Sequence, residues 1–263
     1  MSNKNAQWET MEIIEDDEEE IQKEPVAPKK RVKREPAVLK KYHFDDPGVF
    51  EIGIDEAGRG PLFGRVYTAA VILPKDDTFD HSKMKDSKLF HSKKKISEVS
   101  EYIKQNAIAW SISYEDEKVI DDINILQATQ KAMHKSITST YMMATEKKAL
   151  HGENAKIHLL VDGNYFNPYT QYNKTRKMVE TIPYTCVEGG DNKYTCIAAA
   201  SILAKVARDE YIESLCEENP DLIEKYGIDS NKGYGAKKHL EGIKEHGITI
   251  WHRRSFGICK QFV

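Results

Sequence analysis

The chain has 263 residues, of which 40% are apolar and 31% are charged, and its formal net charge is −3. This length suits one large domain with appendages or two small domains, and the apolar content is sufficient for a buried core. We exclude a transmembrane helix because no apolar run reaches about eighteen residues, and a secretory signal because the acidic N-terminus has no apolar segment.

Two oppositely charged runs mark the N-terminal part. Residues 15–20 are consecutive acids, and the run Lys29–Arg34 is almost entirely basic. Such runs are typical of solvated, disordered segments, so we expect residues 1–45 to be a disordered extension and residues 46–263 to form the folded domain. The basic run is either solvated charge, a nuclear-localisation signal or a nucleic-acid-binding arm. The predicted location is intracellular, cytoplasmic or nuclear.

The first half of the domain predicts three strands and two helices. β-branched and aromatic runs indicate strands at 49–55, 65–74 and 107–114. Between the second and third, Ser92 precedes apolar residues at helical spacing, which predicts a helix up to Asn106. A long helix is expected over 124–149, opened by Asn124.

The second half alternates strands and helices. "KIHLLVDG" at 156–163 is apolar almost throughout and predicts a buried parallel strand, and 181–189 predicts another. An apolar, alanine-rich helix is expected over 194–216, with shorter helices at 219–226 and 236–246. Three strands in a meander followed by alternating elements indicate an α/β sheet with helices on its faces, in one domain.

The cysteines and lysines add two expectations. The four cysteines have no CxxC spacing, which favours intracellular thiols over zinc ligands or disulfides. Residues 81–95 carry six lysines against one acid, and residues 231–263 carry seven lysines and arginines against two acids. Such basic patches are the footprint expected for phosphate contacts.

Four acids lie where predicted strands end. Asp55 and Glu56 end the first strand, Asp162 ends "HLLVD", and Asp191 follows the fifth strand. Residues at strand ends of an open α/β sheet line the crevice where ligands bind, so we expect these carboxylates to converge. Each acid taken alone is better explained as a turn residue or a helix cap, whereas the four acids together favour a metal site.

Convergence of four carboxylates has a chemical consequence. They repel one another unless cations neutralise them. Oxygen ligands without cysteine or histidine are typical of Mg²⁺ and Mn²⁺ sites. The sequence therefore predicts a centre that holds Mg²⁺ or Mn²⁺, with Arg59 aimed elsewhere.

Six blocks of sequence, taken in order, resemble ribonuclease HII, the type 2 ribonucleases H. They span about residues 49–256 and are "GIDEAGRGPLFG", "DSKLF", "LLVDGN", "GGDNKYTCIAAASILAKVARD", "KGYGAKKH" and "HRRSF". The resemblance implies a ribonuclease H-like fold: a mixed central sheet flanked by helices, with a helical C-terminal part. It assigns metal binding and catalysis to the same four acids, Asp55, Glu56, Asp162 and Asp191.

The resemblance also implies the substrate. The family hydrolyses the RNA strand of RNA/DNA hybrids and nicks duplex DNA on the 5′ side of an embedded ribonucleotide, leaving 3′-hydroxyl and 5′-phosphate ends. A monomer without membrane contact is expected. The implied contacts are the 2′-hydroxyl with Gly58, Arg59 and Gly60, the junction sugar with Tyr234, and phosphates with Lys88 and with Lys193 or Lys205.

Two other functions fit part of the pattern. An integrase or transposase of the DDE type shares metal-binding carboxylates but lacks the Gly-Arg-Gly and Lys-Gly-Tyr-Gly segments, which are present here. A catalytically silent hybrid-binding subunit would have lost one or more acids, and all four are intact.

Overall fold

The centre of the fold is a five-stranded mixed sheet, seen in a computed structural model that describes residues 38–149, 156–173 and 176–263. β1 (Val49–Ala57) pairs antiparallel with β2 (Val66–Ile72), and β2 pairs antiparallel with β3 (Ala109–Glu115). On its other side β1 pairs parallel with β4 (Lys156–Asp162), which pairs parallel with β7 (Tyr184–Val187). The order β3-β2-β1-β4-β7 confirms the predicted meander followed by parallel strands.

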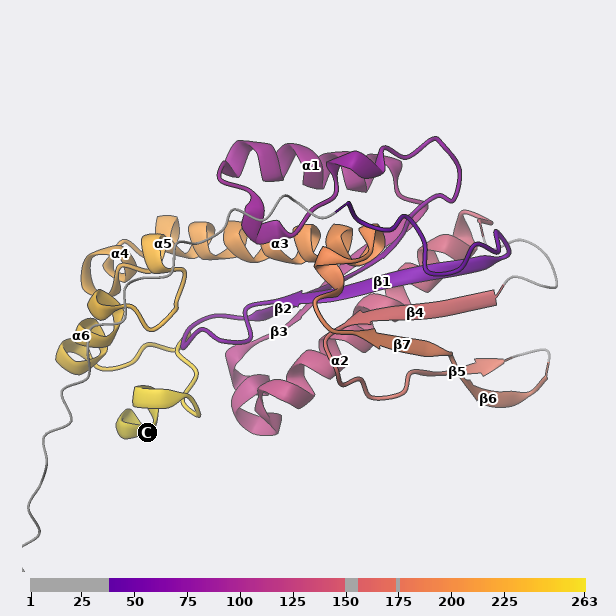
Figure 1. Ribbon diagram of the computed structural model, residues 1–263. Coiled ribbons are helices and arrows are strands. Elements are labelled where there is room, and N and C mark those ends of the chain that lie inside the picture. The colour runs from indigo at the N-terminus through magenta and orange to yellow at the C-terminus, as the bar shows by residue number, and fades with distance from the viewer. Residues whose placement is uncertain (1–37, 150–155, 174–175) are drawn as a thin grey trace, which may run out of the picture. The chain divides into compact units, whose positions relative to one another are not determined.

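Helices cover both faces of this sheet (Figure 1). α1 (Lys93–Asn106) and α3 (Thr195–Glu218) lie on one face, and α2 (Glu117–Glu146) lies on the other. Strand β2 shows why both faces are buried: Ala69 and Val71 belong to the core beneath α1 and α3, whereas Ala70 and Ile72 belong to the core beneath α2. The predicted α/β architecture is confirmed.

α3 packs directly on β1 at Gly53. A Cβ atom on Gly53 would lie 2.3 Å from the carbonyl carbon of Cys196, in the first turn of α3, so only glycine allows this approach. The alanines that follow Cys196 keep the helix close to the sheet. This contact fixes the start of α3, and the segment just before it, against the end of β1.

The long helix α2 begins earlier than predicted. The side chain of Asp116 accepts a hydrogen bond from the backbone N–H of Val119, so the helix starts at Glu117 rather than at Asn124. Asn124 interrupts it with a φ of 68°, and its side-chain oxygen accepts from the N–H of Gln127. The predicted cap therefore exists, but it opens the second segment of an already formed helix.

Several short elements were not predicted. β5 (Thr170–Asn173) and β6 (Met178–Thr181) form a separate two-stranded sheet, so the predicted strand at 181–189 is shortened to β7. The helices predicted at 219–226 and 236–246 are confirmed as α4 (Asp221–Tyr226) and α6 (Lys237–His246). The single turn α5 (Ile228–Asn231) lies between them. Together with Phe63 and Ile212 they build a third core at the C-terminal end of α3.

The N-terminal boundary also differs from the prediction. Lys40 forms a β-bridge with Tyr194, and the buried carboxylate of Glu51 accepts hydrogen bonds from the N–H groups of His43 and Phe44. Residues 38–45 therefore belong to the domain rather than to the extension. The acidic run 15–20 and the basic run Lys29–Arg34 lie outside the described residues.

Two further findings concern the cysteines and the helices. All four cysteines are free thiols. In the described ranges, none of the helices combines the length and the apolar character needed to span a bilayer.

Candidate active site

All four predicted acids line one cavity of about 290 Å³ at the carboxyl ends of β1 and β4. The parallel register pairs Ile54 with Val161, so the next residues, Asp55 and Asp162, follow at the same edge of the sheet. Asp191 comes from the short helix η3 (Gly190–Asn192), which is tied to β4 because the Gly190 N–H donates to Asp162 Oδ1 at 2.6 Å. The sheet and the start of α3 thus bring the acids together.

Burial makes this cluster of like charges costly. Asp55 is 5% exposed, and burial, followed by the neighbouring charges of Glu56 and Asp162, raises its pKa well above its usual range. Burial also raises the pKa of Glu56 and of Asp191. A hydrogen bond from the Glu56 N–H to Asp55 Oδ1, at 2.7 Å, opposes this only in part.

Two cationic side chains offset some of the negative charge. Arg59 donates to Glu56 Oε1 at 3.3 Å, and Lys88 Nζ lies 3.5 Å from Asp191 Oδ2. Both cations are largely exposed, so their attraction is screened by water. Arg59 therefore contacts an acid of the site, which corrects the expectation that it is aimed elsewhere.

The donor set fits a divalent metal. Carboxylate oxygens are the hard ligands that Mg²⁺ and Mn²⁺ prefer, and a cation would relieve the repulsion that raises the pKa of Asp55. Within the described ranges, no group of three or more Asp, Glu, His or Cys side chains is placed so that it could hold a metal ion as it stands. Two of the carboxylates are already paired with side-chain cations, Glu56 with Arg59 and Asp191 with Lys88. A bound metal ion would compete with Arg59 and Lys88 for these two carboxylates.

A glycine-rich loop and a tyrosine line the same cavity as the acids. Gly58, Arg59, Gly60 and Tyr234 all line the cavity. Gly58 has a φ of +93°, and a Cβ atom there would lie 2.3 Å from Arg208 Nε, so the position requires glycine. At Gly60 the nearest atom to such a Cβ is Tyr234 Cε1 at 3.5 Å, which places the half-exposed tyrosine ring beside the loop.

The structure separates the two lysines that the resemblance left open. Lys205 lines the cavity and forms an ion pair with Asp209 at 2.6 Å. Lys193 is exposed, is not among the lining residues, and contributes its backbone carbonyl to the N–H of Lys40. Lys88 also lines the cavity.

Sequence reasoning missed several residues at the cavity. Ser87 and Ser201 line it, and their hydroxyls are 3.1 Å apart. Arg208 also lines it although only 2% of the residue is exposed, and its Nε has no hydrogen-bond partner among the described residues. A buried guanidinium with a free donor is suited to an anionic ligand. No pattern in the sequence indicates that this arginine is buried, because arginine is usually found at the surface.

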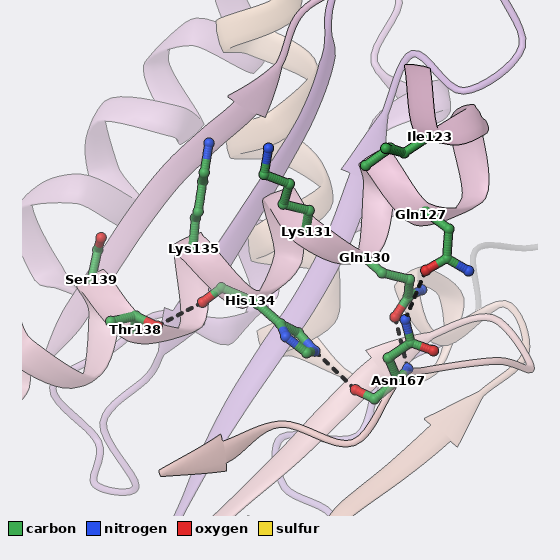
Figure 2. A pocket seen from close by; sticks show the side chains of 9 residues that line it. All are labelled: Ile123, Gln127, Gln130, Lys131, His134, Lys135, Thr138, Ser139 and Asn167. Atoms are coloured by element: carbon green, nitrogen blue, oxygen red, sulfur yellow. Dashed lines mark hydrogen bonds between the residues drawn. The ribbon is translucent and has the colours of Figure 1, made fainter. Parts of the chain in front are cut away.

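A second, larger cavity of about 590 Å³ lies on the outer side of α2 (Figure 2). Its lysines, Lys131 and Lys135, both form ion pairs with the buried carboxylate of Glu115. His134 and Gln130 hydrogen-bond the backbone of Asn167, which joins this helix to the loop after β4. These contacts explain the polar groups as structural, so the acidic cavity is the better candidate for catalysis.

Comparisons with known proteins identify the relatives. A family model described as ribonuclease HII matches residues 52–259. The curated relatives include the ribonuclease HII of Bacteroides thetaiotaomicron, 42% identical over 210 residues that cover 80% of this chain and 90% of the relative. The ribonuclease HII of Parabacteroides distasonis is 43% identical over 218 residues, 83% of this chain and 95% of the relative.

Solved structures share the fold. Ribonuclease H2 from Pyrococcus horikoshii OT3 has a TM-score of 0.58 at 19% identity and covers 81% of this chain and 96% of that one. The PCNA:RNase HII complex from Archaeoglobus fulgidus gives 0.55 at 22%, covering 80% and 96%. Bst-RNase HIII in complex with Mn²⁺ gives 0.56 at 18%, covering 81% and 69%. Together these similarities confirm the predicted ribonuclease H-like architecture.

Proposed function

The chain belongs to the ribonuclease HII family, and from this premise we propose that Asp55, Glu56, Asp162 and Asp191 are its catalytic, metal-binding residues. It is a metal-dependent hydrolase, an endoribonuclease that acts on the RNA strand of RNA/DNA hybrids. One observation carries the residue assignment: the four acids, distant in sequence, line a single cavity at the strand ends.

The metal in this proposal is Mg²⁺ or Mn²⁺, held by the four carboxylates. When bound, a pair of such ions activates the attacking water and stabilises the leaving oxygen of the phosphodiester. The chain's own carboxylates fix where those ions sit, because Asp55 and Asp162 are anchored on adjacent strands and Asp191 on a helix tied to β4. No histidine or lysine is needed as a general base.

The glycine-rich loop and Tyr234, which line the same cavity, are assigned to the substrate. We assign the 2′-hydroxyl to Gly58, Arg59 and Gly60, since glycines allow backbone groups to approach a ligand and the 2′-hydroxyl is what separates RNA from DNA. Tyr234 is assigned to the sugar next to the ribonucleotide, which is supported by its exposed ring beside Gly60. Cleavage is then expected 5′ of an embedded ribonucleotide.

Phosphate contacts are assigned to Lys88 and Lys205. Both line the cavity, and Lys88 already contacts Asp191. We assign no such contact to Lys193, because it does not line the cavity.

The remaining parts of the proposal concern the whole chain. We propose that it acts as a monomer, with residues before the described domain as a charged extension. For the basic run Lys29–Arg34 we favour a nucleic-acid-binding arm, because the comparisons give no support to a nuclear signal. Deletion of residues 1–35 should then lower the salt dependence of substrate binding while leaving cleavage at moderate salt nearly unchanged.

The test uses an end-labelled DNA duplex with a single embedded ribonucleotide. With Mg²⁺ or Mn²⁺ the chain should produce one nick on the 5′ side of the ribonucleotide, with a 3′-hydroxyl that a polymerase extends. Neither an EDTA-treated reaction nor the variant Asp55→Asn should produce it. Metal-independent cleavage, or cleavage by the variant at close to the wild-type rate, would overturn the assignment of the acids.

A further inference from the structure

The segment Trp251–Arg253 lies against the loop that follows β1. Phe63 and His252 form an isolated antiparallel bridge, the Gly64 N–H donates to the Trp251 carbonyl, and the Arg253 N–H donates to the Leu62 carbonyl, at 2.9 and 2.8 Å. In Figure 1 the loop between β1 and β2 correspondingly reaches the yellow C-terminal part of the chain. Residues almost two hundred positions apart in the sequence thus share one short backbone pairing.

The side chain of Arg253 extends this contact beneath the glycine loop. Its guanidinium donates hydrogen bonds to four backbone carbonyls, at 2.6, 3.0, 2.9 and 2.8 Å, which belong in chain order to Gly58, Arg59, Pro61 and Gly64. The residue is fully buried. In the described ranges it forms no ion pair with a carboxylate, so the loop carbonyls are what compensate its charge.

These bonds determine which backbone groups of the loop remain available. The loop carbonyls accept hydrogen bonds from Arg253, whereas the N–H groups of Gly58, Arg59 and Gly60 remain free to donate to a ligand. None of these N–H groups has a hydrogen-bond acceptor among the described residues. Successive free N–H groups suit an anionic oxygen of a ligand. Only the planar fork of arginine reaches four carbonyls at once, whereas the ammonium of lysine has three donors at one point.

The preceding residue, His252, is linked through His239 to the backbone of Tyr234. Its Nδ1 accepts from the Thr249 N–H at 2.9 Å, so its proton must be on Nε2, 3.1 Å from Nε2 of His239. His239 Nε2 is then the acceptor, and its Nδ1 donates to the Tyr234 carbonyl at 2.8 Å. The tautomers of both histidines are thereby assigned from their neighbours.

Both imidazoles are held in their neutral forms. Burial, and then the neighbouring His239, lowers the pKa of His252 to about 3, and burial lowers the pKa of His239. A neutral pair is required for the chain of bonds, because a protonated His239 would present a donor to the donor of His252. The chain therefore stays intact across the physiological pH range.

We propose that the adjacent residues His252 and Arg253 are positioning residues that hold the two substrate-recognition elements in register: Arg253 the loop Gly58–Gly60, and His252, through His239, the backbone of Tyr234. The proposal depends on the function proposed above for those two elements. A short C-terminal segment then sets the spacing between the group that recognises the 2′-hydroxyl and the group that recognises the neighbouring sugar. A displacement of about 1 Å in such a contact is enough to cost on the order of 100-fold in rate.

The test of Arg253 compares Arg253→Lys with Arg254→Lys, a matched change at the exposed neighbouring arginine. Hydrogen exchange followed by mass spectrometry should show faster exchange over residues 58–64 in Arg253→Lys only. Its kcat/KM on a single-ribonucleotide duplex should fall about 100-fold. On a continuous RNA/DNA hybrid, where many adjacent positions offer a 2′-hydroxyl, the loss should be at least severalfold smaller. Equal losses on both substrates with unchanged exchange would overturn the proposal.

A second test uses His252 and does not depend on whether Arg253→Lys folds. In His252→Gln the amide still offers an N–H donor to His239, whereas His252→Leu does not. We expect faster exchange over residues 232–236 and a loss of discrimination for the single ribonucleotide in the leucine variant, and substantial rescue in the glutamine variant. Two equally impaired variants with unchanged exchange would overturn the positioning role.

A parallel measurement on Tyr234→Ala separates this inference from the proposed function. If that variant cleaves both substrates at the wild-type rate, the role proposed for Tyr234 fails. The exchange experiments do not involve substrate, so they report on the positioning by His252 and Arg253 in either case.

Discussion

Two sets of residues line the cavity, and they are built in different ways: the four acids, here called the acidic wall, and the loop Gly58–Gly60 with Tyr234, here called the recognition wall because of the role proposed above. In the acidic wall, Asp55 and Asp162 lie at the ends of hydrogen-bonded strands and are located by the register of β1 with β4, whereas Asp191 lies on η3. The recognition wall consists of irregular backbone, the loop Gly58–Gly60 and the turn at Tyr234. Its geometry depends on buried polar side chains that reach it from elsewhere, chiefly Arg253 and His239.

The difference also appears in the electrostatics. In the acidic wall the negative charges are only partly compensated. Burial, together with the neighbouring like charges, therefore raises the pKa of Asp55. Behind the recognition wall lie two buried guanidiniums, Arg208 and Arg253, and burial lowers the pKa of Arg253 to about 9. One wall thus suits cations and the other suits a phosphodiester backbone, and a metal-bound nucleic acid satisfies both.

The largest effect is expected on the acidic wall. Asp55→Asn should reduce cleavage in Mg²⁺ by about 1,000-fold or more, since a carboxylate that positions the metal is lost. The same change should stabilise the metal-free protein by roughly 1 kcal/mol, because it removes a buried like charge. Thermal unfolding with EDTA and single-turnover cleavage measure the two effects. A destabilised variant would contradict the account of the raised pKa of Asp55.

Gly58 and Gly60 provide a matched pair on the recognition wall. Gly58→Ala should destabilise the fold by about 2–4 kcal/mol, because its φ is positive and the new Cβ would meet the buried Arg208 guanidinium at 2.3 Å. Gly60→Ala meets only Tyr234, at 3.5 Å, and should change stability by less than about 0.5 kcal/mol. Chemical denaturation of both variants checks this. Similar losses would show that Arg208 does not restrict the loop.

The contrast between the two walls also explains which residues of the cavity can be predicted from the sequence. The acids of the proposed metal site are predictable because apolar runs end at Asp55 and Asp162, and strand ends of an α/β sheet gather at one edge. Arg208 and Arg253 are not predictable from pattern, because their partners are backbone carbonyls, and carbonyls carry no sequence signal. For a related reason the sequence left Lys193 and Lys205 as alternative phosphate contacts: spacing alone does not say which lysine lines the cavity, and Lys205 does.

The fold shows the same division. Strands with long apolar runs, such as β1 and β4, are predicted well because burial on both faces requires those residues. The hairpin of β5 and β6 is missed because "TQYN" and "MVET" lack an apolar alternation. At Asn124 the local cap is real, but the helix before it is stabilised by Asp116 and by packing, which outweigh the break.

Tyr234 allows the recognition wall to be tested without disturbing the acids. Tyr234→Ala should cost about 1–3 kcal/mol in transition-state binding on a single-ribonucleotide duplex, by analogy with bases stacked on aromatic rings. The loss on a continuous hybrid should be smaller, since no single junction must be recognised there. Measurement of kcat/KM on both substrates gives the ratio. Equal losses would make Tyr234 a general contact.

The smallest effect concerns the pH dependence of stability. The pKa of His252 is about 3 in the folded protein, against 6.5 for an unburied histidine. Below pH 6.5, His252 therefore takes up a proton in the unfolded chain but stays neutral in the folded protein. Its contribution to the free energy of unfolding is full above that pH and declines as the pH falls toward 3. For one such group the decline between pH 7 and pH 5 is at most about 2 kcal/mol.

His252→Gln should show a flatter decline of stability than the wild type over this range, because glutamine does not titrate. Urea unfolding at a series of pH values separates this effect from the carboxylates, whose titration is common to both proteins. Parallel curves would mean that His252 is not held neutral by its burial, and the tautomer assignment that links it to Tyr234 would fail with it.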